Sequence, residues 1–206
     1  MNGRITRRLA AALAFVALAA PALAQQDPDP IAGLDPASRH AVEALLDSAR
    51  AEGLPTQPLI SKTQEGVSKH APGKLIASVV RTVFLSLREA RTTLGPLATR
   101  DELTAAAGAL QAGIPSAAIA DLRDARRGKP VTVPLVVLAD LVTRGVPRDT
   151  ASRAILQLWA GGAGDADFLG LWRGVEQDIV SGAAPADALL TRAREIPVRL
   201  PPSKIP

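Results

Sequence analysis

One short pattern recurs along the chain and constrains its fold more than any other feature. It consists of a residue that is usually glycine, then an apolar residue, then a proline. It occurs at Gly53-Leu54-Pro55, His70-Ala71-Pro72, Gly113-Ile114-Pro115 and Gly145-Val146-Pro147, with a looser copy at Gly182-Ala183-Ala184-Pro185. Glycine readily adopts the left-handed conformation that ends a helix, and proline fixes φ at the value that the first turn of a helix requires. The pattern therefore predicts tight joints between successive helices, with the apolar residue packing back against them.

Between these joints, apolar residues recur with the three-to-four-residue period of an amphipathic helix. The clearest stripe runs through residues 76–94, and residues 135–142 are apolar on nearly every side except at Asp140, so we expect that helix to be the most buried. The one run of β-branched residues is cut short by Pro134. We therefore predict an all-α fold: a compact bundle of about eight or nine helices built from helical hairpins with Gly-x-Pro joints, or a solenoid-like stack of such hairpins.

Composition divides the chain into four parts. Residues 1–24 are basic and then apolar, residues 25–34 are rich in proline, aspartate and glycine, residues 35–195 carry the helical periods, and residues 196–206 are proline-rich and basic. We interpret these parts as a cleavable signal peptide, a flexible leader, a single helical domain and a basic tail. Within the domain we expect hairpins at about 58–94, 100–127, 134–160 and 165–195.

Capping signals mark two helix starts within the domain. Asp35 followed by Pro36 is typical of a helix N-terminus. Thr99 and Glu102 have the three-residue spacing of a capping box, in which each side chain accepts a hydrogen bond from the backbone N–H of the other residue. We therefore expect helices to begin directly after Asp35 and Thr99.

The segment 1–24 predicts the destination of the protein. Its basic start is followed by the apolar run LAAALAFVALAA, and Ala22 and Ala24 supply the small side chains that signal peptidase requires. We expect general secretion, cleavage after Ala24 and a mature chain that begins at Gln25, in the periplasm or outside the cell. The apolar run is shorter than the roughly 20 residues of a membrane span, so we expect no transmembrane helix after cleavage.

Charge and composition exclude several classes of function. The chain has 24 basic and 20 acidic side chains, a net charge of +4, but the predicted signal peptide holds three arginines and no acidic residue. The remaining chain is almost neutral, so we expect no nucleic-acid partner. The sequence contains no cysteine and no tyrosine, which excludes disulfides, thiol nucleophiles, thiolate metal sites and tyrosine acid–base chemistry. Its bias toward alanine, arginine, glycine and proline is typical of a high-GC bacterial genome.

The sequence offers few candidates for catalysis. Its two histidines, His40 and His70, do not have the spacing of a metal site, and we interpret both as structural. Glu65 lies four residues before Lys69, which is the spacing of an ordinary ion pair on a helix surface. We therefore predict no catalytic, cofactor-binding or metal-binding residue.

A glycine-rich acidic stretch, GGAGDAD at residues 161–167, invites comparison with phosphate-binding and calcium-binding loops. No strand precedes it, as a dinucleotide-binding loop requires, and Ala166 occupies a position where the repeated calcium-binding pattern has aspartate. We interpret the stretch as a flexible loop between helices, in which Asp165 or Asp167 caps the helix that follows.

Aromatic and charged residues supply a candidate interaction surface. Trp159 and Phe168 flank the glycine-rich stretch, and Trp172 follows one helical turn later. These three can form a cluster that either closes the core or lines a groove for a partner. Glu65 and Lys69 are the charged candidates for the same role.

The segment 138–159 carries two resemblances. It has the rhythm of a helix-turn-helix, with Arg144, Arg148 and Arg153 nearby, and it resembles small three-helix ubiquitin-binding modules in its apolar-Gly-apolar-Pro turn. The first resemblance implies DNA as the partner, and the second implies a peptide or protein. Acidic residues in the segment offset the positive charge of the arginines. A protein exported by the predicted signal peptide would not meet chromosomal DNA, so DNA is not the expected partner.

We therefore expect an exported, non-catalytic helical protein that acts as a binding or scaffolding module in the bacterial cell envelope, with another protein or an envelope component as its partner. Two alternatives stay open. Carboxylates such as Glu65 or Glu176 could serve an envelope hydrolase of unknown substrate, and the proline-rich basic tail at residues 196–206 could hold the protein at a membrane surface.

Overall fold

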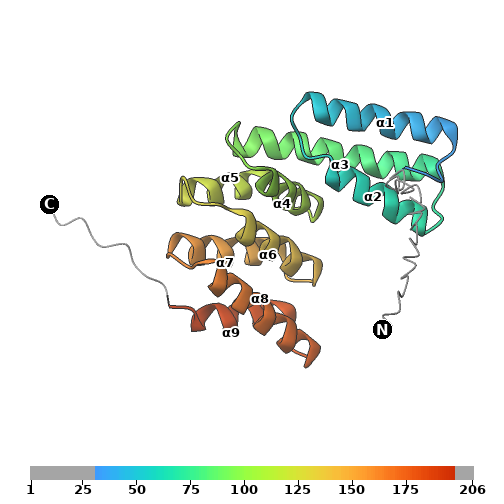
Figure 1. Cartoon of the computed structure of the whole chain (residues 1–206). Coiled ribbons are helices and arrows are strands. Elements are labelled where there is room, and N and C mark those ends of the chain that lie inside the picture. Colours follow the sequence, from blue (N-terminus) through green and yellow to red (C-terminus); the bar gives the residue numbers. More distant parts are fainter. Residues whose placement is uncertain (1–30, 198–206) are drawn as a thin grey trace, which may run out of the picture.

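The computed structural model describes residues 31–197, which form nine α-helices and no strand (Figure 1). This confirms the predicted all-α fold. The predicted signal peptide and most of the predicted tail lie outside the described residues. The helices are α1 (Pro36–Ala51), α2 (Gln57–Ser68), α3 (Gly73–Leu94), α4 (Arg100–Gln111), α5 (Ser116–Ala125), α6 (Thr132–Thr143), α7 (Arg148–Ala160), α8 (Asp165–Val180) and α9 (Pro185–Glu195).

The helices form a stack of two layers (Figure 1). Helices α4, α6 and α8 lie side by side in one layer, while α5, α7 and α9 follow one another in the second. The 22-residue helix α3 contacts both α4 and α5, and α1 and α2 also pack against it. Each hairpin after α3 therefore packs mainly on its neighbours in the chain, which is the arrangement of a solenoid.

The predicted joints form through the same two backbone hydrogen bonds. Between α4 and α5, Gly113 N donates to Leu110 O at 2.9 Å and Ile114 N donates to Ala109 O at 3.0 Å, while Gly113 adopts a φ of +84°. These bonds satisfy carbonyl groups that the end of a helix leaves free. The same pattern occurs around Gly53, Gly145 and Gly182.

In three of the joints the apolar residue packs into the core, as the pattern predicts. Leu54, Ile114 and Val146 are exposed by only 2%, 1% and 2%. These three joints both reverse the chain and add one side chain to the core, whereas Ala71 is half-buried and Ala183 is exposed in the other two.

The glycine-rich stretch between α7 and α8 is a further joint of this kind, without the proline. Gly162 N donates to Trp159 O at 3.1 Å, Ala163 N donates to Leu158 O at 2.9 Å, and φ of Gly162 is +94°. The flexible loop predicted here is instead a hydrogen-bonded turn, because Gly162 and Ala163 reproduce the conformation of the other joints without help from proline.

The structure supports the predicted caps. Asp35 Oδ1 accepts a hydrogen bond from Ser38 N at 3.1 Å at the start of α1. At the start of α8, Asp167 Oδ2 accepts one from Gly164 N at 2.8 Å. Of the two aspartates considered for α8, Asp167 therefore provides this bond.

His70 occupies the position that glycine takes in the other joints. Its φ is +53°, and it is the one residue other than glycine with a positive φ in the described part of the chain. The joint still forms, because His70 N donates to Val67 O at 2.9 Å and Ala71 N donates to Gly66 O at 3.0 Å. A residue with a Cβ is strained in this conformation.

Replacing His70 with glycine should raise the free energy of unfolding by about 0.5–1 kcal/mol, because the steric cost of a positive φ exceeds the entropy that glycine adds to the unfolded chain. Urea denaturation followed by circular dichroism measures the change. The reverse exchange Gly145→His is the control and should destabilise the protein. A Cβ at this position would lie 3.7 Å from its nearest neighbour, Pro185 Cγ, so the cost comes from the positive φ and not from a steric clash. Unchanged midpoints for both variants would refute this explanation.

Glu102 is a buried carboxylate that connects α4, α5 and the start of α6. Its Oε2 accepts a hydrogen bond from Thr99 N at 2.9 Å, and Thr99 Oγ1 accepts one from Glu102 N at 3.2 Å, which confirms the capping box. Its Oε1 accepts a hydrogen bond from Val131 N at 3.2 Å and lies 3.0 Å from Arg123 Nη2. Burial by itself raises the pKa of Glu102, but the bonds from Thr99, Val131 and Arg123 outweigh it and hold the pKa below its usual value.

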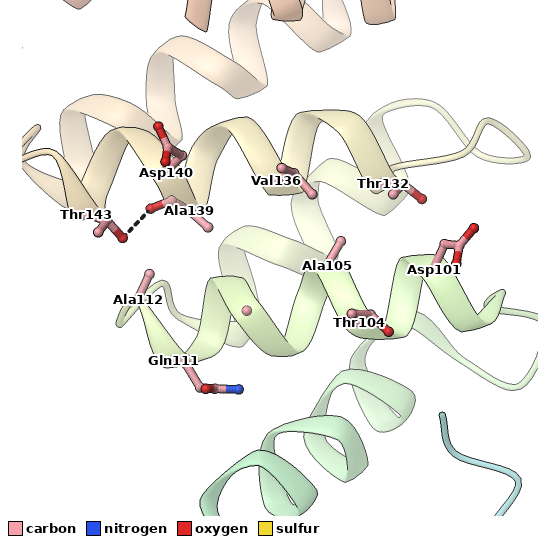
Figure 2. A pocket seen from close by; sticks show the side chains of 11 residues that line it. Asp101, Thr104, Ala105, Gln111, Ala112, Thr132, Val136, Ala139, Asp140 and Thr143 are labelled. Carbon is pink, nitrogen blue, oxygen red and sulfur yellow. Dashed lines mark hydrogen bonds between the residues drawn. The ribbon is translucent and has the colours of Figure 1, made fainter. Parts of the chain in front are cut away.

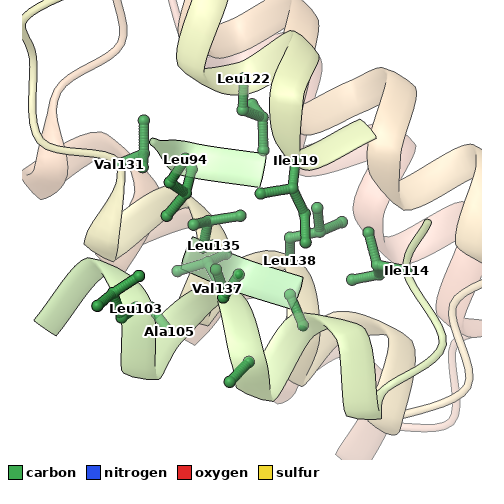
Figure 3. Close-up of a cluster of buried hydrophobic side chains, with 14 of the residues drawn as sticks. Leu94, Leu103, Ala105, Ile114, Ile119, Leu122, Val131, Leu135, Val137 and Leu138 are labelled. Atoms are coloured by element: carbon green, nitrogen blue, oxygen red, sulfur yellow. The ribbon is translucent and has the colours of Figure 1, made fainter. Parts of the chain in front are cut away.

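Leucine and isoleucine side chains from four helices meet in the core of the stack (Figure 3). They are Leu94 of α3, Leu103 of α4, Ile119 of α5, and Leu135 and Leu138 of α6. Their burial supplies the apolar contacts that hold the middle of the stack together.

Helix α6 is less buried than its composition predicts. Leu135, Leu138 and Leu141 are at most 1% exposed, but Val136 is 52% exposed. The reason is the position of α6, which lies between α4 and α8 and packs against α7, so that one side stays uncovered. This uncovered side forms one wall of a groove.

Candidate functional site

A groove of about 680 Å³ runs between α4 and α6 (Figure 2). It extends along most of both helices. Its lining consists of Asp101, Thr104, Ala105, Gly108, Gln111 and Ala112 from α4 and its C-terminal end, and of Thr132, Val136, Ala139, Asp140 and Thr143 from α6.

The groove exists because the side chains along it are small. Ala105 and Ala139 reach toward the space between the helices without filling it (Figure 2), and Gly108 contributes no side chain at all. A Cβ added at Gly108 would meet no atom within 4 Å. Val136 adds an exposed apolar surface from the opposite wall. The result is a hollow with mainly apolar walls, which is the usual character of a binding site.

Both ends of the groove carry a carboxylate, and no lysine or arginine belongs to its lining. Asp101 lies in the first turn of α4. At the other end, Asp140 accepts a hydrogen bond from Trp172 Nε1 at 2.5 Å and forms an ion pair with Arg144, whose Nη2 also lies 2.9 Å from Glu176 Oε1. Arg148 Nη1 donates to Gly113 O at 3.1 Å beside the same end, so the carboxylates of Asp140 and Glu176 are balanced there by two guanidinium groups.

Arg144 holds this second end of the groove together. The hydrogen bond with Asp140, reinforced by the charges of Asp140 and Glu176, outweighs desolvation and raises the pKa of Arg144 above its ordinary value. The guanidinium carbon also lies 5.6 Å from the centre of the Trp172 ring. Arg144 and Trp172 therefore connect α6 to α8 and fix the orientation of the Asp140 carboxylate.

The three aromatic candidates from the sequence lie in two different environments. Trp159 and Phe168 are 3% and 0% exposed, with ring centres 6.1 Å apart, so they belong to the core and cannot line a surface groove. Trp172 is only partly buried and contacts Asp140 at the end of the groove. Of the predicted aromatic cluster, only Trp172 is close to the candidate site.

The charged candidates lie elsewhere. Lys62 and Lys69 approach the two oxygens of Glu65 at 2.5 and 2.6 Å on α2, a helix that packs on α3 and is separated from α8 by the length of the stack (Figure 1). The hydrogen bonds from Lys62 and then Lys69 lower the pKa of Glu65 to about 2. Glu65 therefore stays ionised and paired near neutral pH, which suits a surface ion pair better than a proton donor.

The carboxylates of the alternative hydrolase are not brought together. Glu65 lies on α2 and Glu176 on α8, and each is paired with basic side chains. Within residues 31–197, no group of three histidine, aspartate or glutamate side chains is placed to hold a metal ion. None of the helices in this part of the chain combines the length and hydropathy needed to cross a membrane.

The groove itself does not follow from the sequence interpretation, although one signal for it is present. Ala105, Gly108 and Ala112 are spaced at i, i+3 and i+7 and so place small residues along one face of α4. The sequence does not indicate which face of α6 lies opposite these residues of α4.

No protein-family model, curated protein or solved structure matches the chain.

Proposed function

We propose that the protein is an exported, non-catalytic binding module of the bacterial cell envelope and that it holds another protein in the α4/α6 groove. The observation that carries this proposal is the groove itself: an apolar hollow lined by small side chains, with Val136 52% exposed on one wall. An exposed apolar surface costs free energy in water and is commonly covered by a partner. The stacked hairpins offer a rigid frame for such a surface.

Export is the part of this proposal that rests on the sequence. We expect the protein recovered from the periplasm or the culture medium to begin at Gln25, as measured by the mass of its N-terminal peptide. Replacing Ala22 and Ala24 together with arginine should leave the chain uncut, because signal peptidase reads small side chains at these positions. A cytoplasmic protein that retains residues 1–24 would contradict the proposal.

Binding through the groove can be tested in intact cells. A photo-crosslinking amino acid in place of Val136 should give discrete adducts with another protein, whereas the same group in place of Arg153, an exposed residue of α7, should not. Adding Gly108→Leu to the Val136 variant should remove the adducts, because leucine would occupy the hollow. Adducts that are equal at both positions, or that persist with Gly108→Leu, would contradict a role for the groove.

A further inference from the structure

A second pocket, of about 390 Å³, lies where the end of α3, the start of α4, the end of α5 and the loop between α5 and α6 meet. It shares no lining residue with the α4/α6 groove. We infer that this pocket binds an apolar carboxylate, with the carboxylate beside Arg123 and Lys129 and the apolar part against Leu97. Three features lead to this ligand: an incompletely bonded guanidinium, an unpaired lysine and an exposed leucine.

Arg123 brings to the pocket a guanidinium whose hydrogen-bonding capacity is only partly used. Its Nη2 lies 3.0 Å from Glu102 Oε1, and 22% of its side chain is exposed. Its Nε is buried and has no hydrogen-bond partner among the described residues. A buried donor of this kind is commonly explained by a bound water or ion. Because a guanidinium has five N–H donors in one plane, Arg123 can pair with Glu102 on one side and with a second carboxylate on its pocket side.

Lys129 supplies a positive charge that the pocket does not balance. It lies in the loop between α5 and α6, lines the pocket and is exposed. No carboxylate of residues 31–197 forms an ion pair with it. Arg123 and Lys129 share the lining with one acidic residue, Glu102, so the lining carries one net positive charge. A ligand with a single negative charge would neutralise it.

The nearby acidic residues do not take the place of the ligand. Glu102 is 3% exposed, and its two oxygens accept hydrogen bonds from Thr99 N and Val131 N, so its carboxylate is committed to the fold. Asp124, which follows Arg123 in the chain, pairs with Arg127 at 3.0 Å. The positive charge of Lys129 is therefore available to a bound molecule.

The other part of the pocket wall is apolar, and one of its side chains is uncovered. Leu97 is 94% exposed, which makes it the most exposed large apolar side chain of the described residues. Leu94, Ala98 and Pro130 line the pocket together with it. An apolar chain bound in the pocket would cover Leu97 and remove apolar surface of both molecules from water, which is favourable.

The size and charge of the pocket limit the ligand. A volume of about 390 Å³ is near the small end of the range for small-molecule sites. One net positive charge suits a carboxylate better than a phosphate monoester, which carries almost two negative charges near neutral pH. A fatty acid of about eight carbons and the C-terminal residue of a peptide both meet these limits, and they share the same chemistry.

The test titrates the purified protein, in the form that the cell accumulates, with octanoate and with a tripeptide of two alanines and a C-terminal leucine. Octanol and the C-terminal amide of the tripeptide are the uncharged controls. Backbone amide shifts in the NMR spectrum should saturate around Leu97, Arg123 and Lys129 with at least one of the two carboxylates. Each uncharged control should bind about tenfold more weakly or worse, because it lacks the charge-assisted hydrogen bonds. Binding of octanoate alone indicates a lipid-derived ligand, and binding of the tripeptide indicates a chain terminus.

Two pairs of matched variants make this result specific. Lys129→Gln should weaken binding about fivefold to tenfold, whereas Lys74→Gln, at an exposed lysine of α3 outside the pocket, should change it by less than about twofold. Leu97→Ser should weaken binding about threefold or more, whereas Val180→Ser, at an apolar residue of α8 that is 82% exposed, should have no effect. All four side chains are exposed, and thermal unfolding by circular dichroism checks that the variants are folded.

Arg123 itself is kept, because its removal would leave the buried Glu102 carboxylate without a counter-charge and would destabilise the fold. Equal affinities for Lys129→Gln and Lys74→Gln would overturn the inference. So would equal binding of each carboxylate and its uncharged control, or amide shifts that lie away from the pocket. The crosslinks at Val136 report on the α4/α6 groove alone, so their presence or absence does not affect this result.

Discussion

Replacing Glu102 with alanine should lower the free energy of unfolding by about 3–5 kcal/mol, the cost of breaking a buried ion pair on one side. Glu102 is 3% exposed, and its carboxylate accepts hydrogen bonds from Thr99 N and Val131 N while it forms an ion pair with Arg123. Alanine would leave the two backbone donors without this acceptor and Arg123 without its counter-charge. The loss would weaken the contacts of α4 with both α5 and the start of α6.

Urea denaturation followed by circular dichroism measures this loss. Glu89→Ala is the matched control, because Glu89 is an exposed residue of α3, and it should change the free energy of unfolding by less than about 0.5 kcal/mol. If the Glu102 and Glu89 variants have the same denaturation midpoint, Glu102 does not hold the helices together.

The same variant should change the response to acid. The pKa of Glu102 is held below its ordinary value in the folded protein, so the folded state binds fewer protons than the unfolded state at low pH. The stabilisation is complete above the unfolded pKa of about 4.3 and is lost as the pH falls through the lower, folded pKa. Between pH 7 and pH 3 the natural protein should therefore lose more stability than Glu102→Ala does.

Replacing Trp159 with alanine should cost about 3–5 kcal/mol, as expected for a large aromatic side chain in a core. Trp159 is 3% exposed, its Nε1 donates to Leu122 O at 2.9 Å, and its ring lies against Phe168. Arg126 covers the ring at 4.1 Å from its centre and donates to Ala163 O at 2.8 Å. Alanine would open a cavity and leave the Leu122 carbonyl without this donor.

Trp172→Ala provides the comparison, since Trp172 is the other tryptophan of the chain and is only partly buried. It should cost about 1–2 kcal/mol, mainly through the lost contacts with Asp140 and Arg144. Chemical denaturation by circular dichroism gives both values. In Trp172→Phe, the fluorescence of Trp159 alone should report a buried, unfolding-sensitive indole. Equal losses for the two alanine variants would contradict the assignment of Trp159 to the core and Trp172 to the surface.

Much of the fold could be predicted from the sequence because its determinants are local. A helix end with Gly113, a following apolar Ile114 and then Pro115 specifies its own backbone conformation within three residues. The capping box of Thr99 and Glu102 is equally local. Such features need no knowledge of the tertiary structure, and the all-α fold follows from them together with the amphipathic periods.

The candidate site could not be predicted in the same way, because it depends on contacts between distant residues. Glu102 meets Val131, 29 positions away, and Trp172 meets Asp140, 32 positions away. The periods place Trp159 and Trp172 on apolar stripes, but only the packing of α7 and α8 separates a core residue from one beside a groove. The hollow itself depends on which faces of α4 and α6 are opposite each other.

The position of α3 has a mechanical consequence for the molecule. Helices α1 and α2 reach the rest of the stack mainly through α3, which in turn packs on α4 and α5. A pull or a bound molecule at the α1/α2 end therefore acts on α4 and α5 chiefly through α3. Since α4 belongs to one layer and α5 to the other, α3 is the helix that transmits such a load to both layers.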